Sequence, residues 1–305
     1  VTNYSGTAAT LGSISVSGSA FRLAGLPTLP VTLTAVQPGA QIDFEVQFWP
    51  VAPGSAQGTL SIEGQSFSLA GTGLLPTLSG VSITGVTDTA AARQDLTAGL
   101  QLSAAYAFEM TGTLELAFTP DAVNPSDDPA KTFSGGRTVA FTIPANSRSA
   151  TFASQAASRF STGSVAGTIL LTAKLQAFGS NLTPSPAASR SVRILRAAPE
   201  ITSVTVQNKT SSGFEVHVTG LATPREVTQA TFRFAGTSLQ TTELTADVNT
   251  LFTTWYKGAE SSQFGSTFKY IQAFSVTQGS VSNISSVALT LRNSVGTSNS
   301  MSANF

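Results

Sequence analysis

The chain of 305 residues contains no cysteine and a single histidine, His217. Without thiols it has no disulfide, no thiolate nucleophile and no cysteine-ligated zinc or iron–sulfur site. A Ser-His-Asp triad would have to use His217, yet the chain has no Gly-x-Ser-x-Gly elbow. His217 lies between Val216 and Val218 in a predicted strand, so we expect it to face outward beside Glu215. We therefore predict a protein that is not an enzyme, with no catalytic residue, no metal site and no cofactor.

Charged residues are also scarce, at 10% of the chain, and sixteen basic residues balance sixteen acidic ones. No segment concentrates one sign, which argues against a nucleic-acid partner. No apolar run approaches the roughly 20 residues that a transmembrane helix needs. The N-terminus lacks the charged and apolar regions of a signal peptide, and Val1 to Asn3 resembles the middle of a strand. We therefore expect a first domain that is truncated at its N-terminus.

Alternation of apolar and polar residues is the clearest pattern present, above all from Val36 to Gly73. Between Ile42 and Phe48 every apolar residue occupies an even position, the period of a half-buried strand. Two further alternating runs, Gly58 to Glu63 and Ser66 to Leu69, flank Gly64-Gln65, which we interpret as a tight hairpin turn. The pattern predicts a β-sandwich.

Two joints that contain proline divide the chain into three segments. The first joint runs from Gly71 to Pro76 and the second is Ala197-Ala198-Pro199. We predict three domains, a truncated β-sandwich at 1–75, a β-sandwich at 76–197 and an immunoglobulin-like β-sandwich at 198–305. The fold class is thus all-β, with tandem immunoglobulin-like sandwiches.

The second and third segments repeat the alternating pattern. Strands are predicted at 114–118, 139–143 and 169–175, and then at 204–206, 214–218, 231–234, 268–276 and 286–291. The stretch from Pro120 to Gly136, rich in proline and glycine, is predicted to be a surface loop. Val248, Leu251, Phe252 and Trp255 recur at helical spacing instead and predict one short helix in the last domain. We expect this helix to bury Trp255 and to leave Tyr256 nearer to solvent.

The first segment resembles a known family in several motifs. These are Pro38-Gly39, the run Phe44 to Phe48 followed by Pro50, the triplet Gly58 to Leu60 and the closing run Leu69 to Gly73. On these motifs it resembles the ASPM–SPD-2–Hydin family, which also occurs as a repeat in bacterial surface proteins of the "choice-of-anchor" type. The resemblance covers about the first quarter of the chain. It implies an immunoglobulin-like sandwich that acts as a scaffolding or surface module without catalytic residues.

The middle segment faintly resembles Calx-β repeats, in Gly112 to Leu114 and in the strand end Phe141 to Ala145. That resemblance implies calcium binding by acidic loop residues. Candidates share the loop Asp121–Asp128, and they are Asp121, Asn124, Asp127 and Asp128. Calcium takes six to eight oxygen ligands and only three carboxylates are local. A solvated turn is the simpler interpretation of this loop, and calcium binding stays open.

Three other patterns bear on function. Ser266 and Lys269 match the Ser-x-x-Lys spacing of serine acyl enzymes, but that chemistry needs a helix and these residues fall in a predicted strand. Asp127-Asp128 are adjacent on a loop, which does not suit the paired carboxylates of a glycoside hydrolase. Trp255-Tyr256 is the best candidate for a sugar-binding platform, although the helical spacing favours core packing.

The function that fits these patterns best is a non-catalytic structural or interaction module. A spacer or protein-binding array of a bacterial secreted or cell-surface protein is predicted, because neutral Ser/Thr/Gly-rich chains without cysteine are typical of such proteins. Its partner would be a protein or a cell-surface component, and its location extracellular. A carbohydrate-binding module or a calcium-stiffened adhesion module is the alternative. No ligand-binding residue is identified.

Overall fold

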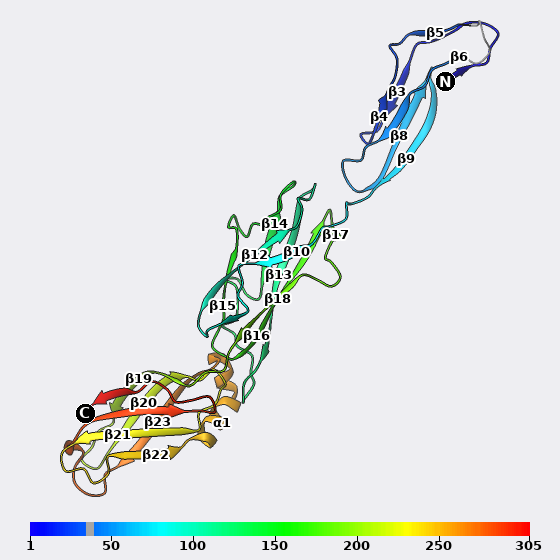
Figure 1. The fold of residues 1–305 in the computed structure, drawn as a ribbon. Coiled ribbons are helices and arrows are strands. Elements are labelled where there is room, and N and C mark those ends of the chain that lie inside the picture. The colour runs from blue at the N-terminus through cyan, green and yellow to red at the C-terminus, as the bar shows by residue number, and fades with distance from the viewer. Residues whose placement is uncertain (35–39) are drawn as a thin grey trace. The chain divides into compact units, whose positions relative to one another are not determined.

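The computed structural model describes residues 1–34 and 40–305 and shows an all-β chain (Figure 1). Two compact units are present, Val1–Thr77 and Leu78–Phe305. The predicted fold class, tandem immunoglobulin-like sandwiches with one short helix, is confirmed. That helix is α1 (Asn249–Lys257), and it is accompanied by the 3-10 turns η1 (Ala259–Phe264) and η2 (Val281–Asn283). Within the described ranges, no helix has the length and apolarity that a bilayer crossing requires.

The first unit consists of short antiparallel strands. They pair as β1-β6, β2-β5, β4-β7 and β3-β8-β9. Their bounds are β1 (Thr2–Asn3), β2 (Ala9–Leu11), β3 (Ile14–Ser17), β4 (Phe21–Ala24), β5 (Val31–Leu33), β6 (Ala40–Gln41), β7 (Glu45–Phe48), β8 (Gly54–Ile62) and β9 (Gln65–Gly73). Among the described residues of this unit, the buried apolar side chains are Leu11, Ile14, Ala20 and Leu33.

The predicted hairpin is present, but its turn lies one residue earlier than expected. Ile62 of β8 pairs with Gln65 of β9, so the turn residues are Glu63 and Gly64. Both have positive φ angles, 49° and 80°, as a two-residue type I′ turn requires. The strand predicted over residues 42–48 is shorter, because only β7 (Glu45–Phe48) pairs with a neighbour, β4. Val36 and Pro38-Gly39 lie outside the described residues.

Residues 81–194 of the second unit form two facing sheets. One has the order β10-β12-β15, and the other β11-β18-β16-β13-β14, with β17 also paired to β16. Their bounds are β10 (Val81–Thr84), β11 (Thr89–Ala90), β12 (Asp95–Leu102), β13 (Met110–Pro120), β14 (Thr138–Ile143), β15 (Ser158–Ser161), β16 (Gly167–Ala177), β17 (Ser180–Asn181) and β18 (Ser189–Ile194). The predicted strands at 114–118, 139–143 and 169–175 are confirmed as β13, β14 and β16.

Residues 200–304 form a second pair of sheets, with the orders β19-β20-β23 and β22-β21-β24-β25. Their bounds are β19 (Glu200–Gln207), β20 (Gly213–Leu221), β21 (Gln229–Gly236), β22 (Glu243–Asp247), β23 (Thr267–Ser275), β24 (Ile284–Arg292) and β25 (Met301–Asn304). The five strands predicted here are confirmed, and β22 and β25 were not predicted. Inward side chains of both sheets form one core, for example Val216, Val218, Phe232, Leu289 and Leu291.

The helix α1 is confirmed, but its buried face is rotated from the prediction. Phe252 and Tyr256 are its buried residues, whereas Leu251 is half exposed and Trp255 only partly buried against the core. The spacing i, i+4 that runs from Val248 through Phe252 to Tyr256 therefore faces inward. The expectation that Tyr256 lies nearer to solvent than Trp255 is wrong. Contacts of the Tyr256 side chain with residues outside α1 hold its ring in this buried position, as described below.

The two pairs of sheets in the second unit agree with the domains proposed at 76–197 and 198–305. Both pairs nevertheless belong to the single compact unit Leu78–Phe305. The three-domain division therefore stays a prediction. The reason for this grouping is found where the two pairs of sheets meet.

Candidate functional site

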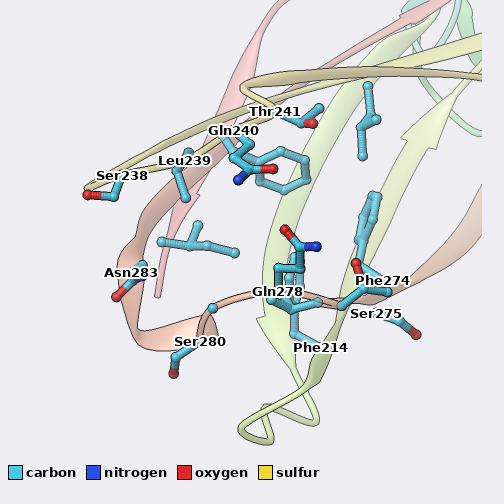
Figure 2. Close-up of a pocket in the computed structure, with 16 residues that line it drawn as sticks. Phe214, Ser238, Leu239, Gln240, Thr241, Phe274, Ser275, Gln278, Ser280 and Asn283 are labelled. Atoms are coloured by element: carbon cyan, nitrogen blue, oxygen red, sulfur yellow. The ribbon is translucent and has the colours of Figure 1, made fainter.

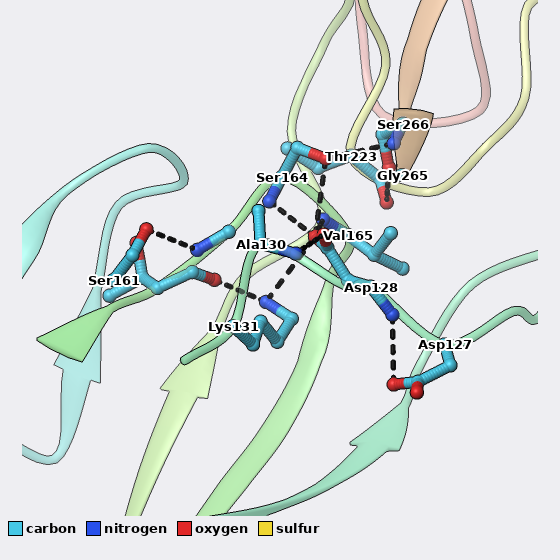
Figure 3. Close-up of polar contacts among 12 residues, drawn as sticks. Asp127, Asp128, Ala130, Lys131, Ser161, Ser164, Val165, Thr223, Gly265 and Ser266 are labelled. Carbon is cyan, nitrogen blue, oxygen red and sulfur yellow. Dashed lines mark hydrogen bonds and ion pairs between the residues drawn. The ribbon is translucent and has the colours of Figure 1, made fainter. Parts of the chain in front are cut away.

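A network of buried polar side chains lies where the two pairs of sheets meet, and we call it the polar joint. Its members are Asn124, Asp128, Lys131, Ser164, Thr223, Arg225 and Ser266, all of which are buried. Figure 3 shows part of it, with Asp128 next to Ser164 and Val165, and with Gly265 and Ser266 close to Ser164.

Asp128 holds the loop that follows β13 in place. Its side chain is 1% exposed. Its Oδ2 accepts hydrogen bonds from the backbone N–H groups of Ser164 (2.5 Å) and Val165 (2.8 Å), and its Oδ1 accepts one from Ala130. Hydrogen bonds from several backbone N–H groups replace the water that this buried carboxylate has lost. The predicted surface loop from Pro120 to Gly136 is therefore wrong in this part, because the loop is packed between the two pairs of sheets.

Lys131 is buried next to Asp128. Its side chain is 0% exposed, its Nζ lies 3.9 Å from Asp128 Oδ2, and it donates a hydrogen bond to the Thr162 carbonyl. The ammonium also lies 4.3 Å from the centre of the Phe118 ring, a cation–π distance. Burial lowers the pKa of Lys131 to about 8, and the Asp128 charge opposes that shift. Asp128 is thus the counter-ion of an otherwise costly buried cation.

Arg225 carries the charge on the other side of the polar joint. Its side chain is among the largest fully buried ones. The guanidinium donates to the carbonyl oxygens of Asn124, Tyr256 and Gly265 and, at 2.9 Å, to Ser261 Oγ. It also lies 4.8 Å from the centre of the Tyr256 ring. Burial lowers the pKa of Arg225, and the neutral oxygens that surround it replace the water it has lost.

Hydrogen bonds cross the polar joint in both directions. Asn124 Nδ2 donates to the Arg225 carbonyl at 2.9 Å, and Arg225 Nε donates to the Asn124 carbonyl at 2.8 Å. The Ser266 N–H donates to Ser164 Oγ at 2.8 Å. Three more backbone N–H groups donate across it, those of Val123 to Pro224 O, Ala166 to Thr223 O and Ala197 to Thr223 Oγ1. Loops far apart in sequence are thus joined by these six hydrogen bonds.

Gly265 lets the two sides of the polar joint approach this closely. Its φ is +59°, and a Cβ at this position would overlap Ser164 Oγ and lie 3.0 Å from Asp128 Oδ1. Only glycine combines that backbone conformation with the available space. The ring of Tyr256 is fixed at the same place, because its hydroxyl donates to the Ser266 carbonyl at 2.9 Å. These contacts explain why Tyr256, and not Trp255, faces inward.

The acidic residues of the Asp121–Asp128 loop do not converge on one point. Asp121 pairs with Arg196 at 2.6 Å, and Asp127 pairs with Arg137 at 2.6 Å. Asp128 is engaged as described above, and the Asn124 amide belongs to the polar joint. Among residues 1–34 and 40–305, no group of three or more acidic or histidine side chains is arranged to hold a metal ion. The solvated-turn interpretation is also wrong for Asp128, which is buried.

The remaining candidates are not brought together. His217 lies on the outer face of β20, where its Nε2 is 2.7 Å from Glu215 Oε2, as predicted. Hydrogen bonds to His217 and Asn208 lower the pKa of Glu215. Ser266 is buried in the polar joint while Lys269 is exposed, so they do not form a catalytic pair.

A second candidate site is an open cleft at the other end of residues 200–304, and we call it the end cleft (Figure 2). Its volume is about 660 Å³. The rings of Phe214, Phe234 and Phe274 lie at its base, and the loops 237–242 and 276–280 form its walls. No side chain that lines it is charged. Sequence reasoning did not find this site, because its parts lie on two loops and several strands that only the fold brings together.

No protein-family model matches the chain, and no curated protein sequence matches it. Among solved structures, the FN1–FN3 domains of chicken CNTN1 are 13% identical with a TM-score of 0.24, and the alignment covers 96% of this chain and 97% of that one. The Escherichia coli adhesin FdeC is 14% identical with a TM-score of 0.23, covering 100% and 88%. Escherichia coli alpha-2-macroglobulin activated by porcine elastase is 9% identical with a TM-score of 0.26, covering 98% and only 30%.

Proposed function

We propose that the chain is a non-catalytic structural and interaction segment of a bacterial secreted or cell-surface protein. In this role it holds consecutive β-sandwiches, those proposed at 76–197 and 198–305, in one fixed arrangement. The observation that carries the proposal is the polar joint. Protein segments that act as flexible tethers are joined by solvated linkers with few contacts. Here the residues that meet include the buried charges of Asp128, Lys131 and Arg225.

The energetics of the polar joint favour a rigid element. Opening the polar joint would expose the Arg225 and Asp128 groups to water, but it would also break the hydrogen bonds that now cross it. Buried charged networks are sensitive to geometry, so a small rotation would leave donors and acceptors unpaired. This sensitivity favours one relative arrangement of the two pairs of sheets over a continuous range of arrangements. A spacer that presents a binding surface at a set position needs that property.

The proposed interaction role rests on the end loops and sheet edges of the sandwiches. Loops at the ends of sandwiches and unpaired sheet edges are the usual contact points of such modules. The partner would be a protein or another cell-surface component. A calcium-stiffened role is not proposed, because the loop carboxylates already pair with arginine and lysine side chains.

Distances between spin labels test this function, and the absence of cysteine makes the labelling site-specific. One label is attached at Thr138→Cys on β14 and the other at Lys269→Cys on β23, both exposed positions. A fixed arrangement predicts one narrow distance distribution. Its width should match that of a control pair within one sandwich, Thr138→Cys with Ser191→Cys. A distribution much broader than the control would contradict the proposal.

A further inference from the structure

The end cleft differs from an ordinary surface depression in its chemistry. Its lining combines aromatic rings with amide and hydroxyl side chains and contains no charge. The polar side chains are Ser238, Gln240, Thr241, Ser275, Thr277, Gln278, Ser280 and Asn283. Its volume of about 660 Å³ falls within the range of small-molecule sites, roughly 300–1,000 Å³. Anionic and cationic ligands would find no counter-charge there, so an uncharged ligand fits best.

The amides of Gln240 and Gln278 are free to bind a ligand. Figure 2 shows these two side chains on facing walls of the end cleft, one from each loop. Neither side-chain amide has a hydrogen-bond partner among the described residues, in contrast to Gln272, whose amide is engaged by Tyr270 and Ala273. A glutamine amide offers two donors and one acceptor in a plane. Two such groups across one cleft can each pair with neighbouring hydroxyl groups of a bound molecule.

The base of the end cleft supplies an apolar surface. Phe214, Phe234 and Phe274 form a cluster in which Phe214 and Phe274 stack at 5.2 Å and Phe234 meets both rings edge to face. Phe234 and Phe274 remain partly exposed within the lining. Leaving aromatic surface in contact with water is unfavourable. A ligand with an apolar face would remove that cost.

We propose that the end cleft binds a short neutral saccharide. A sugar ring has C–H faces that pack on phenylalanine rings and a rim of hydroxyl groups that pair with side-chain amides. The end cleft provides both, the rings at its base and Gln240 and Gln278 on its walls. An extended peptide is the rival ligand, because the lining includes residues of the edge strands β22 and β23. A peptide that pairs with a strand edge would use backbone groups there and would not need the amides of Gln240 and Gln278. The proposal goes beyond the structural function, and its failure would leave that function untouched.

Binding to immobilised glycans tests the proposal. The full chain is applied to an array that carries neutral and acidic oligosaccharides, and the strongest neutral binder is then titrated by calorimetry. We expect binding to neutral glycans only. The double variant Gln240→Ala/Gln278→Ala should weaken it by about tenfold or more, because two neutral hydrogen bonds are lost.

A matched control is Gln229→Ala, which removes an exposed glutamine from the start of β21, at the opposite end of the same sandwich. This variant should bind as the wild type does, and near-identical circular dichroism spectra should show that all three proteins are folded. Amide chemical shifts should change at 238–244 and 275–284 upon binding. Failure of every neutral glycan to bind would overturn the proposal. So would binding that the double variant retains, or binding of uncharged peptides in place of glycans.

Discussion

Replacement of Arg225 by methionine is expected to destabilise residues 78–305 by about 3 kcal/mol or more. Methionine keeps much of the apolar volume but donates no hydrogen bonds. The buried carbonyl oxygens of Asn124 and Gly265 would lose their donor, and that of Tyr256 would keep the Ser261 hydroxyl as its donor. Hydrogen bonds to a charged group contribute about 1.5–3 kcal/mol each, so the loss exceeds that of an ordinary surface change. Urea denaturation of the full chain, followed by circular dichroism, measures it.

The control for this variant is Arg233→Met on β21. Arg233 is exposed and pairs with Glu243 across the strands, a surface contact that contributes about 0–1 kcal/mol. The control should therefore unfold within about 1 kcal/mol of the wild type. The Arg225 variant should also show a broader distribution of distances between the spin labels on β14 and β23. Equal stability of the two variants would show that Arg225 does not hold the polar joint.

Replacement of Asp128 by alanine is expected to cost about 3–5 kcal/mol, while the same change at its neighbour Asp127 costs less than about 1 kcal/mol. Asp128 neutralises the buried Lys131 and accepts the N–H groups of Ser164 and Val165. The Asp127 side chain is 63% exposed, pairs with the partly exposed Arg137 and accepts one hydrogen bond from the Asp128 N–H. Two adjacent carboxylates of the same chemistry thus differ in burial and in their hydrogen-bond partners. Urea denaturation of both variants measures the difference.

A second substitution separates the charge from the hydrogen bonds. The double variant Asp128→Ala/Lys131→Met also removes the buried cation. Its loss of stability should therefore be smaller than the sum of the losses of the two single variants, by about 1–3 kcal/mol. Similar stability of the Asp127 and Asp128 single variants would contradict the structural role of this loop. Calcium added to the wild type should leave its melting unchanged, because the loop carboxylates are already paired.

The strands could be predicted from the sequence because one local rule determines them. Alternation with a period of two is visible wherever a strand has one buried face, as in β13, β16 and β20. Shorter strands such as β22 escaped detection, because the residues Glu243–Asp247 are mostly exposed and carry little alternation. The predicted hairpin turn is one residue too far along the chain, because glutamate at position 63 is not a residue type that indicates a turn.

The polar joint could not be predicted, because its residues look like loop residues one at a time. Asp128 follows proline and serine in a polar loop, and only the packing of that loop makes it buried. Arg225 follows Pro224 at a strand exit, where a charged residue is ordinarily solvated. The rotation of α1 has the same origin, because the contacts of Tyr256 with Arg225 and Ser266 are not local. Long-range polar contacts leave no period in the sequence.

The proposed sugar site is the end cleft and not Trp255-Tyr256, again because of contacts that the sequence does not show. Trp255-Tyr256 looked suitable in the sequence, yet Tyr256 is buried in the polar joint and Trp255 packs against the core. The end cleft instead uses phenylalanines that any core could contain. Their partial exposure depends on how the loops 237–242 and 276–280 end, and residue type does not reveal it.

Amide hydrogen exchange at the polar joint tests the central claim most directly. The N–H groups of Val123, Ala166 and Ser266 all lie outside strands or at their ends, and each donates to an acceptor across the polar joint. If the polar joint is closed in solution, these three amides exchange as slowly as those in the middle of β16 and β20, by opening of the whole unit. Exchange as fast as that of the exposed loop 237–242 would contradict a closed polar joint and, with it, the fixed arrangement of the two pairs of sheets.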